Sequence, residues 1–286
     1  MFTQILINSI IAGSIYTLIS LGFNLTYGAS RFFNFSHGSF IIVGGYLVLF
    51  LSKTIGLNLI LSMVLGLLIT GILGLMTYTL IFSKLRQWKA SNMVLLISSI
   101  GIFIIIQSVV AMLFSSKFQT LSLNIGNSRI YDLFGASISK VQIISVAASA
   151  LITMIFFFIL RDTYFGKTMR AVSDAEEIAK IVGIPTEKYI GYTFFIGAVL
   201  AGAAGIIIGL DTGIEPSRGF SYLLKGIAAS IIGGVGNVYG GLLGSYFIGL
   251  LENFGIWKNS GVWKDTIIFL FLMIFLFIKS LKTLKK

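Results

Sequence analysis

The organisation of this chain is decided by residues 161–189, RDTYFGKTMRAVSDAEEIAKIVGIPTEKY. This stretch is the longest polar interval of an otherwise apolar sequence, and it holds five of the ten acidic residues and five of the 21 basic ones. Apolar segments of about 20 residues, long enough to cross a bilayer, flank it on both sides. The stretch therefore connects two membrane segments and lies outside the bilayer.

The pattern inside this stretch predicts one short helix over about residues 174–182. Ser173 is a candidate N-cap, and Glu176 three residues later would complete a capping box. Acidic side chains in a first turn favour the positive end of the helix dipole. The residues of this predicted first turn are Asp174, Ala175, Glu176 and Glu177.

The end of the same helix is also marked. Lys180 can form an i,i+4 ion pair with Glu176. Gly183 can take the left-handed position after the last turn, and Ile184 and Pro185 follow, with the proline preventing continuation. The helix is too short to be stable alone in water, and one face is apolar: Ile178, Ile181 and Val182. It must lie against something, either its own membrane ends and the lipid interface or a soluble partner, and we favour the partner.

Composition restricts the class of protein. The chain is 56% hydrophobic and 11% charged, with a mean hydropathy of +0.97, whereas soluble domains carry about 25% charged residues. It has no cysteine and one histidine, which excludes disulfides, thiolate metal sites and a histidine-rich metal cluster. The net charge of +11 is expected to set membrane topology, not to bind nucleic acid.

Hydropathy predicts six regular spans, followed by a less regular last third. The six cover residues 4–27, 37–52, 56–82, 93–114, 141–160 and 190–210. Two short apolar segments, 222–232 and 242–254, flank GGVGNVYGG (233–241), which predicts either paired half-helices or two tilted spans. A last apolar segment covers 263–278. We expect an all-α, polytopic transmembrane bundle of about eight spans (seven to nine), forming a single domain over residues 1–286.

Basic residues predict the orientation. The KLRQWK loop (84–89) holds three basic residues, and the tail from 279 holds four. Both belong in the cytoplasm under the positive-inside rule. Counting spans then places 161–189 in the cytoplasm, and 115–140 and the N-terminus outside.

Small residues recur every four positions along the sixth span. Such ridges favour close helix packing over direct contact with a substrate. The ridge consists of Gly197, Ala201, Gly205 and Gly209, and Gly240 and Gly244 repeat the spacing later.

Polar residues in or near the spans are costly in lipid and tend to face cavities. For each of them a helix–helix hydrogen bond is the simpler interpretation, and five remain candidates for a substrate path. The full set is Asn8, Asn24, Asn34, His37, Gln107, Asn237 and Glu252, and the five candidates are Asn34, His37, Gln107, Asn237 and Glu252. Strings of charged pairs, expected of an ion-coupled carrier, are missing.

No catalytic arrangement emerges from the sequence. His37 has no cysteine, serine or carboxylate partner suited to catalysis nearby in sequence. GGVGNVYGG lacks the Gly-Lys-Ser/Thr of a phosphate loop. If a nucleotide drives this protein, another chain must bind it.

Four stretches carry a resemblance to a known family. They are GSIYTLISLGFNLTYGASRFFNFSHGSF (13–40), TYFGKTMRAVSDAEEIAKIVGI (163–184), FIGAVLAGAAGIIIGL (195–210) and LLKGIAASIIGGVGNVYGGLLGSYFIGLLEN (223–253). Together, over roughly residues 8–255, they resemble the branched-chain amino acid ABC-importer permeases. The chain is similar to the smaller of the two permease subunits in the leucine/isoleucine/valine type.

The resemblance implies a set of partners and a location. It implies a second, larger permease subunit, two cytoplasmic ATPases that bind ATP and magnesium, and an extracytoplasmic substrate-binding protein, with no cofactor or enzymatic activity on this chain. It also implies a bacterial or archaeal cytoplasmic membrane with the C-terminus inside. Related permeases serve urea, short amides or nucleosides. A self-sufficient secondary transporter or channel stays open as an alternative.

The resemblance also assigns roles to residues. Asp174, Ala175, Glu176 and Glu177 match the acidic start of the EAA-like coupling loop, and Gly183 matches its glycine. The Asn-Phe-small-His-Gly signature of the family corresponds to Asn34, Phe35, Ser36, His37 and Gly38.

Overall fold

The computed structural model describes residues 2–121, 130–133, 135–255, 257 and 263–284. Most of these residues are helical, in agreement with the expected all-α class. The principal helices are α1 (Phe2–Ser30), α2 (His37–Leu49), α3 (Leu59–Thr77), α4 (Ser83–Gln87), α5 (Asn92–Phe114), α6 (Lys140–Asp162), α7 (Tyr164–Asp174), α8 (Glu176–Ile181), α9 (Thr186–Asp211), α10 (Gly219–Gly233), α11 (Val238–Gly255) and α12 (Lys264–Leu284). Three shorter turns join them: η1 (Phe50–Thr54), η2 (Tyr78–Phe82) and η3 (Pro216–Arg218).

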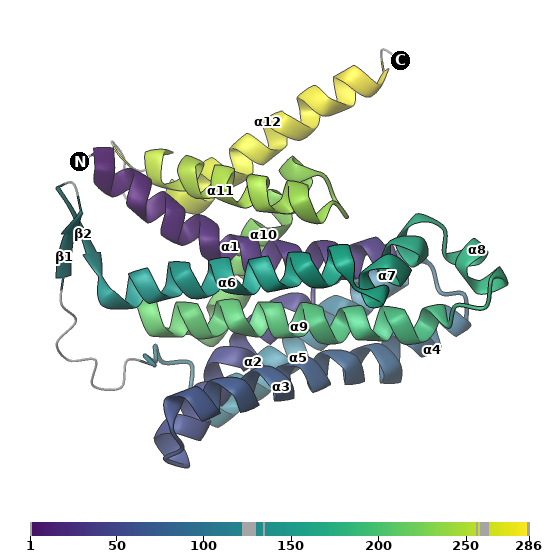
Figure 1. Cartoon of the computed structure of the whole chain (residues 1–286), viewed down its shortest axis with the longest axis horizontal. Coiled ribbons are helices and arrows are strands. Elements are labelled where there is room, and N and C mark those ends of the chain that lie inside the picture. The colour runs from purple at the N-terminus through teal and green to yellow at the C-terminus, as the bar shows by residue number, and fades with distance from the viewer. Residues whose placement is uncertain (1, 122–129, 134, 256, 258–262, 285–286) are drawn as a thin grey trace.

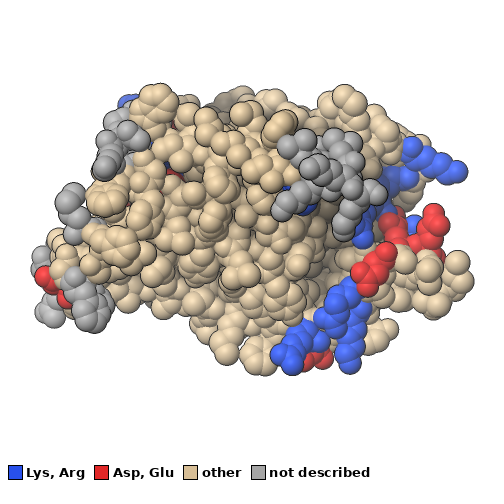
Figure 2. All heavy atoms as spheres, turned by 90° about the horizontal axis from the view of Figure 1, so that it is seen from above, with Lys and Arg blue, Asp and Glu red and all other residues tan. Residues whose placement is uncertain are grey.

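The long helices run side by side, so the bundle has two ends (Figure 1). One end carries α4, α7 and α8. The other carries the N-terminus and an antiparallel hairpin of β1 (Ile130–Leu133) and β2 (Ala136–Ser139). The Gln4 side chain joins the start of α1 to the hairpin: its amide group donates to the Ser137 carbonyl at 3.0 Å, and its carbonyl accepts from the Ser137 backbone amide at 2.8 Å. Figure 2 shows charged side chains gathered towards the α7–α8 end and an uncharged belt beside it.

Burial separates central from peripheral helices. The apolar windows of α2 and α9 are 78% buried, whereas those of α3, α5 and α6 are 28% buried. The outer faces of the peripheral helices expose apolar side chains such as Ile60 and Ile105. An apolar exterior of this kind is stable in lipid and not in water, and the protein is a multi-pass membrane protein.

The helix α9 occupies the centre because its small residues admit other backbones. A Cβ at Gly205 would lie 1.8 Å from the Ile41 carbonyl oxygen on α2, and one at Gly197 would lie 3.1 Å from the Gly22 carbonyl oxygen on α1. A side chain at either position would push the helices apart. The buried residues of this ridge are Gly197, Ala201, Gly205 and Gly209.

The helices α10 and α11 are two short segments bent by 117° at the glycine-rich break. Asn24 on α1 holds the break, since its Oδ1 accepts from the Gly236 amide at 2.9 Å and its Nδ2 donates to the Asn237 carbonyl at 3.2 Å. Small residues let the two segments pack closely: a Cβ at Gly240 would lie 1.8 Å from the Gly233 carbonyl oxygen, and one at Gly244 would lie 2.1 Å from that of Ala229.

Six helices among the described residues are long and apolar enough to cross a membrane, and the bent pair raises the count to as many as seven. This count reaches the lower limit of the seven to nine expected. The difference from eight arises in the last third, because α10 and α11 together count as one bent span and α12, which covers the expected last span, is not among the six.

The expected helix over 174–182 is wrong in its start. The stretch forms two helices, and Ser173 lies inside the last turn of α7. Ala175, with φ −152° and ψ 88°, separates α7 from α8 and stands at the N-cap position without a side-chain cap. The predicted capping box does not form because Ser173 lies within α7, which leaves Ala175 at the N-cap, and because the Glu176 carboxylate binds Arg86.

Candidate functional site

The helix α8 presents an apolar stripe that nothing in the described chain covers. Ile178, Ile181 and Val182 are 63%, 84% and 68% exposed, and together they form what we term the docking stripe. On the opposite side of the helix, Ala179 is 3% exposed and packs into a cluster with Phe82 and other residues of the bundle. The helix therefore rests on the bundle through one face and leaves its larger apolar side chains outside.

An ion-pair network fixes the start of α8. Arg86 on α4 binds the Glu176 carboxylate at 2.6 Å and the Glu187 carboxylate of α9 at 3.4 Å, and Lys180 binds Glu176 at 2.7 Å. Burial raises the pKa of the Glu176 carboxyl, but the hydrogen bonds and charges of Arg86 and Lys180 outweigh burial and hold the pKa below its ordinary value. Glu176 is thus ionised at neutral pH, and Arg86 joins α4, α8 and α9.

The end of α8 follows from its local sequence. Gly183 has φ +86°, its amide donates to the Lys180 carbonyl at 3.0 Å, and the Ile184 amide donates to the Ala179 carbonyl at 3.0 Å. This is the Schellman arrangement, in which a left-handed glycine closes a helix. Pro185 then stands at the N-cap position of α9, so the direction of the chain between α8 and α9 is fixed.

The helix α7 connects α8 to the membrane helices. Thr163 caps its start by accepting from the Gly166 amide at 3.2 Å, and a Cβ at Gly166 would lie 2.0 Å from the Leu160 carbonyl oxygen of α6. Its end is held by Arg31 of α1. The polar segment 161–189 is therefore tied to α1, α4, α6 and α9.

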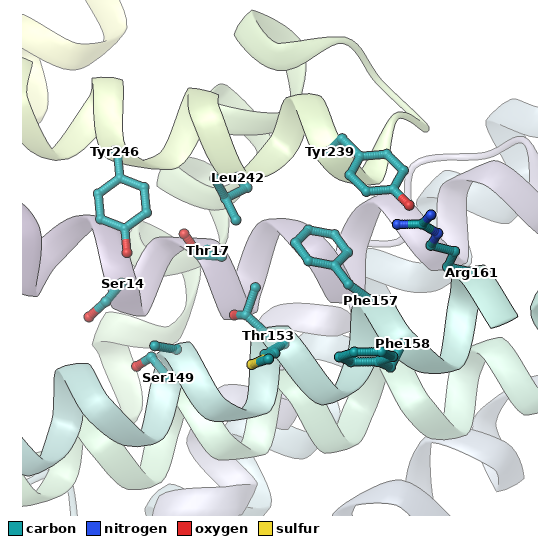
Figure 3. A pocket seen from close by; sticks show the side chains of 12 residues that line it. Ser14, Thr17, Ser149, Thr153, Phe157, Phe158, Arg161, Tyr239, Leu242 and Tyr246 are labelled. Atoms are coloured by element: carbon teal, nitrogen blue, oxygen red, sulfur yellow. The ribbon is translucent and has the colours of Figure 1, made fainter.

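An open cavity of about 480 Å³ lies between α1, α6 and α11 (Figure 3), and exposed side chains such as Phe158 and Tyr239 form part of its wall. Its walls combine hydroxyl groups with aromatic rings: Ser14, Thr17, Ser149, Thr153, Phe157, Phe158, Tyr239 and Tyr246. Figure 3 shows Tyr239 and Tyr246 projecting from α11 toward the other two helices, with Arg161 beside Tyr239 at one end. A wall of this composition accommodates an apolar group that carries a few hydrogen-bonding atoms.

The structure does not bring the five substrate-path candidates into one site. Asn34 forms a local turn, accepting from the Ser36 amide at 3.1 Å. The His37 Nε2 lies 3.1 Å from the Ile19 carbonyl oxygen, so this ring joins α2 to α1. The Gln107 amide donates to the Pro216 carbonyl at 3.1 Å.

The two remaining candidates lie elsewhere. Asn237 is exposed in the break, where its Oδ1 accepts from the Gly240 amide at 3.1 Å. Glu252 is buried at the far end of the bundle and accepts from the Tyr16 hydroxyl at 2.5 Å. Glu252 lines a cavity of about 380 Å³ at that end, and Asn237 lines a separate cavity of about 410 Å³ together with Arg31, Arg170 and Asp174.

The sequence did not predict the long-range cationic partners of Glu176 and Glu252. Arg86 was read as part of a basic loop, and its contact with Glu176 joins residues 90 positions apart. Lys225 within an apolar segment was a signal that went unused, because a lysine inside a span is rare and usually paired.

Comparison with known proteins agrees with this architecture. The family model described as "Branched-chain amino acid transport system / permease component" matches residues 5–277. BraD, a high-affinity branched-chain amino acid transport permease from Pseudomonas aeruginosa, is 28% identical over 89% of this chain and 86% of its own length. LivH from Escherichia coli is 27% identical over 88% and 85%. A probable LivH from Methanocaldococcus jannaschii is 30% identical over 87% and 80%. With nearly its whole length matched, the chain belongs to the family of branched-chain amino acid transport permeases.

Proposed function

We propose that this chain is the permease subunit of an ATP-driven importer that moves branched-chain amino acids across the cytoplasmic membrane. The observation that carries the proposal is the docking stripe, an exposed apolar face on a short helix tied firmly to the bundle. The relatives BraD and LivH are described as branched-chain amino acid permeases, which supports the same substrate class for this chain.

The coupling mechanism follows from the ties of α8. A cytoplasmic ATPase that binds the docking stripe would move α8 when ATP closes the ATPase pair. Arg86 would transmit that displacement to α4 and α9, and the Arg31 contact with α7 would transmit it to α1. Because α1 lines both cavities, a shift of α1 would open one end while it closes the other.

The importer requires partners that this chain does not supply. We propose a second permease subunit, two ATPases that hold ATP and magnesium on the cytoplasmic side, and an extracytoplasmic binding protein. The C-terminus and the 161–189 segment would lie in the cytoplasm. Hydrolysis would take place on the ATPases, so this chain would not itself be an enzyme.

Reconstitution tests the proposal. The complete set of subunits is placed in liposomes with ATP inside and the binding protein outside, and uptake of radiolabelled leucine, urea and adenosine is measured. We expect leucine uptake that requires ATP and the ATPases. Leucine uptake by this chain alone would overturn the importer assignment in favour of a self-sufficient transporter. Urea or adenosine uptake without leucine uptake would overturn the substrate class.

A further inference from the structure

A second cavity lies at the end of the bundle opposite α8, where α9 ends and α6 begins. It has a volume of about 380 Å³, within the range of small-molecule sites. Its walls come from α1, α6, α9, η3, α10, α11 and α12. In Figure 1 the N-terminus and the β hairpin lie at this end.

Buried charges line this cavity. Lys225 and Glu252 are 7% and 4% exposed, and their Nζ and Oε1 atoms lie 3.2 Å apart. The Lys225 ammonium also lies 2.9 Å from the Asp265 carboxylate, and Lys264 lies 3.7 Å from Glu252. Burying such pairs is expensive, and hydrophobic residues would pack the same space at no greater cost. Ionisable groups retained inside a membrane bundle indicate a functional site.

The cavity offers one carboxylate that is still available. Asp211 is half-buried at the end of α9 and has no ion pair within the described part of the chain, its side-chain partner being the Gln142 amide. Two cationic groups also lie on the wall. The Arg218 Nε at η3 donates to Glu215 at 3.2 Å, and its side chain is 53% exposed. The Lys264 side chain is 41% exposed.

Part of the remaining wall is aliphatic, beside polar and aromatic side chains such as Asn8, Asn253 and Tyr222. Ile11, Ala12 and Ile15 line it from one face of α1. The cavity therefore combines a carboxylate without an ion pair among the described residues, two partly exposed cations and an aliphatic surface. These are the groups that complement an ammonium, a carboxylate and a branched aliphatic side chain.

We propose that this cavity binds the zwitterionic head group of an aliphatic α-amino acid on its way through the permease. Asp211 accepts the ammonium group, Arg218 and Lys264 bind the carboxylate, and Ile11 and Ile15 contact the side chain. The inference rests on the proposed function and adds the residues that select the substrate. An uncharged urea or nucleoside offers no ammonium to Asp211 and no carboxylate to Arg218 and Lys264, and a site built to bind these groups rejects ligands that lack them.

The test uses the complete assembly in lipid nanodiscs and a leucine analogue that carries a diazirine on its side chain. After illumination, mass spectrometry locates the labelled residues, and leucine uptake is measured in parallel liposomes. The variant is Asp211→Asn, which keeps the size of the side chain and removes its charge. The matched control is Asp132→Asn in the hairpin at the same end, where the side chain accepts from the Gly135 amide at 2.8 Å and does not line the cavity. Co-purification with the ATPases establishes that each variant assembles.

In the unaltered protein we expect label on residues 11–15 of α1. In Asp211→Asn we expect labelling and leucine uptake to fall about tenfold or more, because the ammonium of the bound amino acid loses a charge-assisted hydrogen bond. Asp132→Asn should behave as the unaltered protein. An analogue without the ammonium group should not protect residues 11–15 from labelling.

If the unaltered protein transports leucine, two results would overturn the inference. One is label confined to the cavity between α1, α6 and α11. The other is equal labelling and equal uptake in Asp211→Asn and Asp132→Asn. Absence of leucine uptake by the unaltered assembly would instead overturn the proposed function, and the inference with it.

Discussion

At the scale of single residues, Arg86 joins helices at the end of the bundle that carries α7 and α8. Its side chain is 14% exposed and contacts two carboxylates from different helices, Glu176 at 2.6 Å and Glu187 at 3.4 Å. Removing the guanidinium would leave both carboxylates partly buried and without their cation. Breaking a shielded pair costs more than the pair itself contributes, because the remaining charges stay desolvated.

We predict that Arg86→Gln destabilises the protein by about 2 kcal/mol, measured as a lower midpoint of thermal unfolding in detergent. The control is Arg161→Gln, because Arg161 and Asp162 form a pair at 3.8 Å with side chains 79% and 58% exposed, and exposed pairs contribute about 0–1 kcal/mol. Equal midpoints for the two variants would show that the Arg86 network contributes no more than a surface pair.

At the scale of elements, α8 is held by polar contacts on one side and leaves the docking stripe free on the other. Its position is fixed at both ends, by Glu176 at the start and by Gly183 at the finish. Replacing exposed side chains of the stripe should therefore leave the helix in place. Such replacements therefore test the binding of a partner without a change in folding.

We predict that the double variant Ile178→Asp with Ile181→Asp folds and inserts normally but loses coupled leucine uptake, because an interface partner would have to bury two unpaired carboxylates. Co-purification of the ATPases and ATP-dependent uptake are the measurements. Ile130→Asp serves as the control, since Ile130 is 72% exposed in β1 at the opposite end. ATP-dependent leucine uptake that persists in the double variant would show that the docking stripe does not bind the ATPase.

At the scale of the whole molecule, the two ends of the bundle differ in content. Arg86, α7 and α8 meet at one end, and Gln4 joins the hairpin at the other. The chain has no native cysteine, so single cysteines report on each end without background. Ser137 and Ile181 are both exposed and suit this purpose.

We predict that a membrane-impermeant maleimide labels Ser137→Cys in intact spheroplasts and labels Ile181→Cys only after the membrane is opened. We expect this orientation because the positive-inside rule places the basic residues at 84–89 in the cytoplasm. Labelling of Ile181→Cys in sealed cells would place α8 outside, where no ATPase could reach it.

Local signals predicted part of the site correctly. Gly183 closes α8 in the left-handed conformation, and Glu176 pairs with Lys180 one turn later. Ser173 shows the limit of such signals, because its spacing from Glu176 fits a capping box and yet the residue lies inside α7. The Glu176 carboxylate binds Arg86, 90 positions away, and nothing within the stretch 161–189 predicts this contact.

The sequence by itself determined which segments enter the membrane and which stretch stays outside, because hydropathy and helix termination depend on neighbours within a few turns. Only the tertiary structure decided which polar groups meet. Arg86 with Glu176 and Lys225 with Glu252 are separated by 90 and 27 positions, and their pairing depends on how the helices pack. The bend between α10 and α11 also depends on tertiary structure, because Asn24 of α1 holds the break from outside that segment.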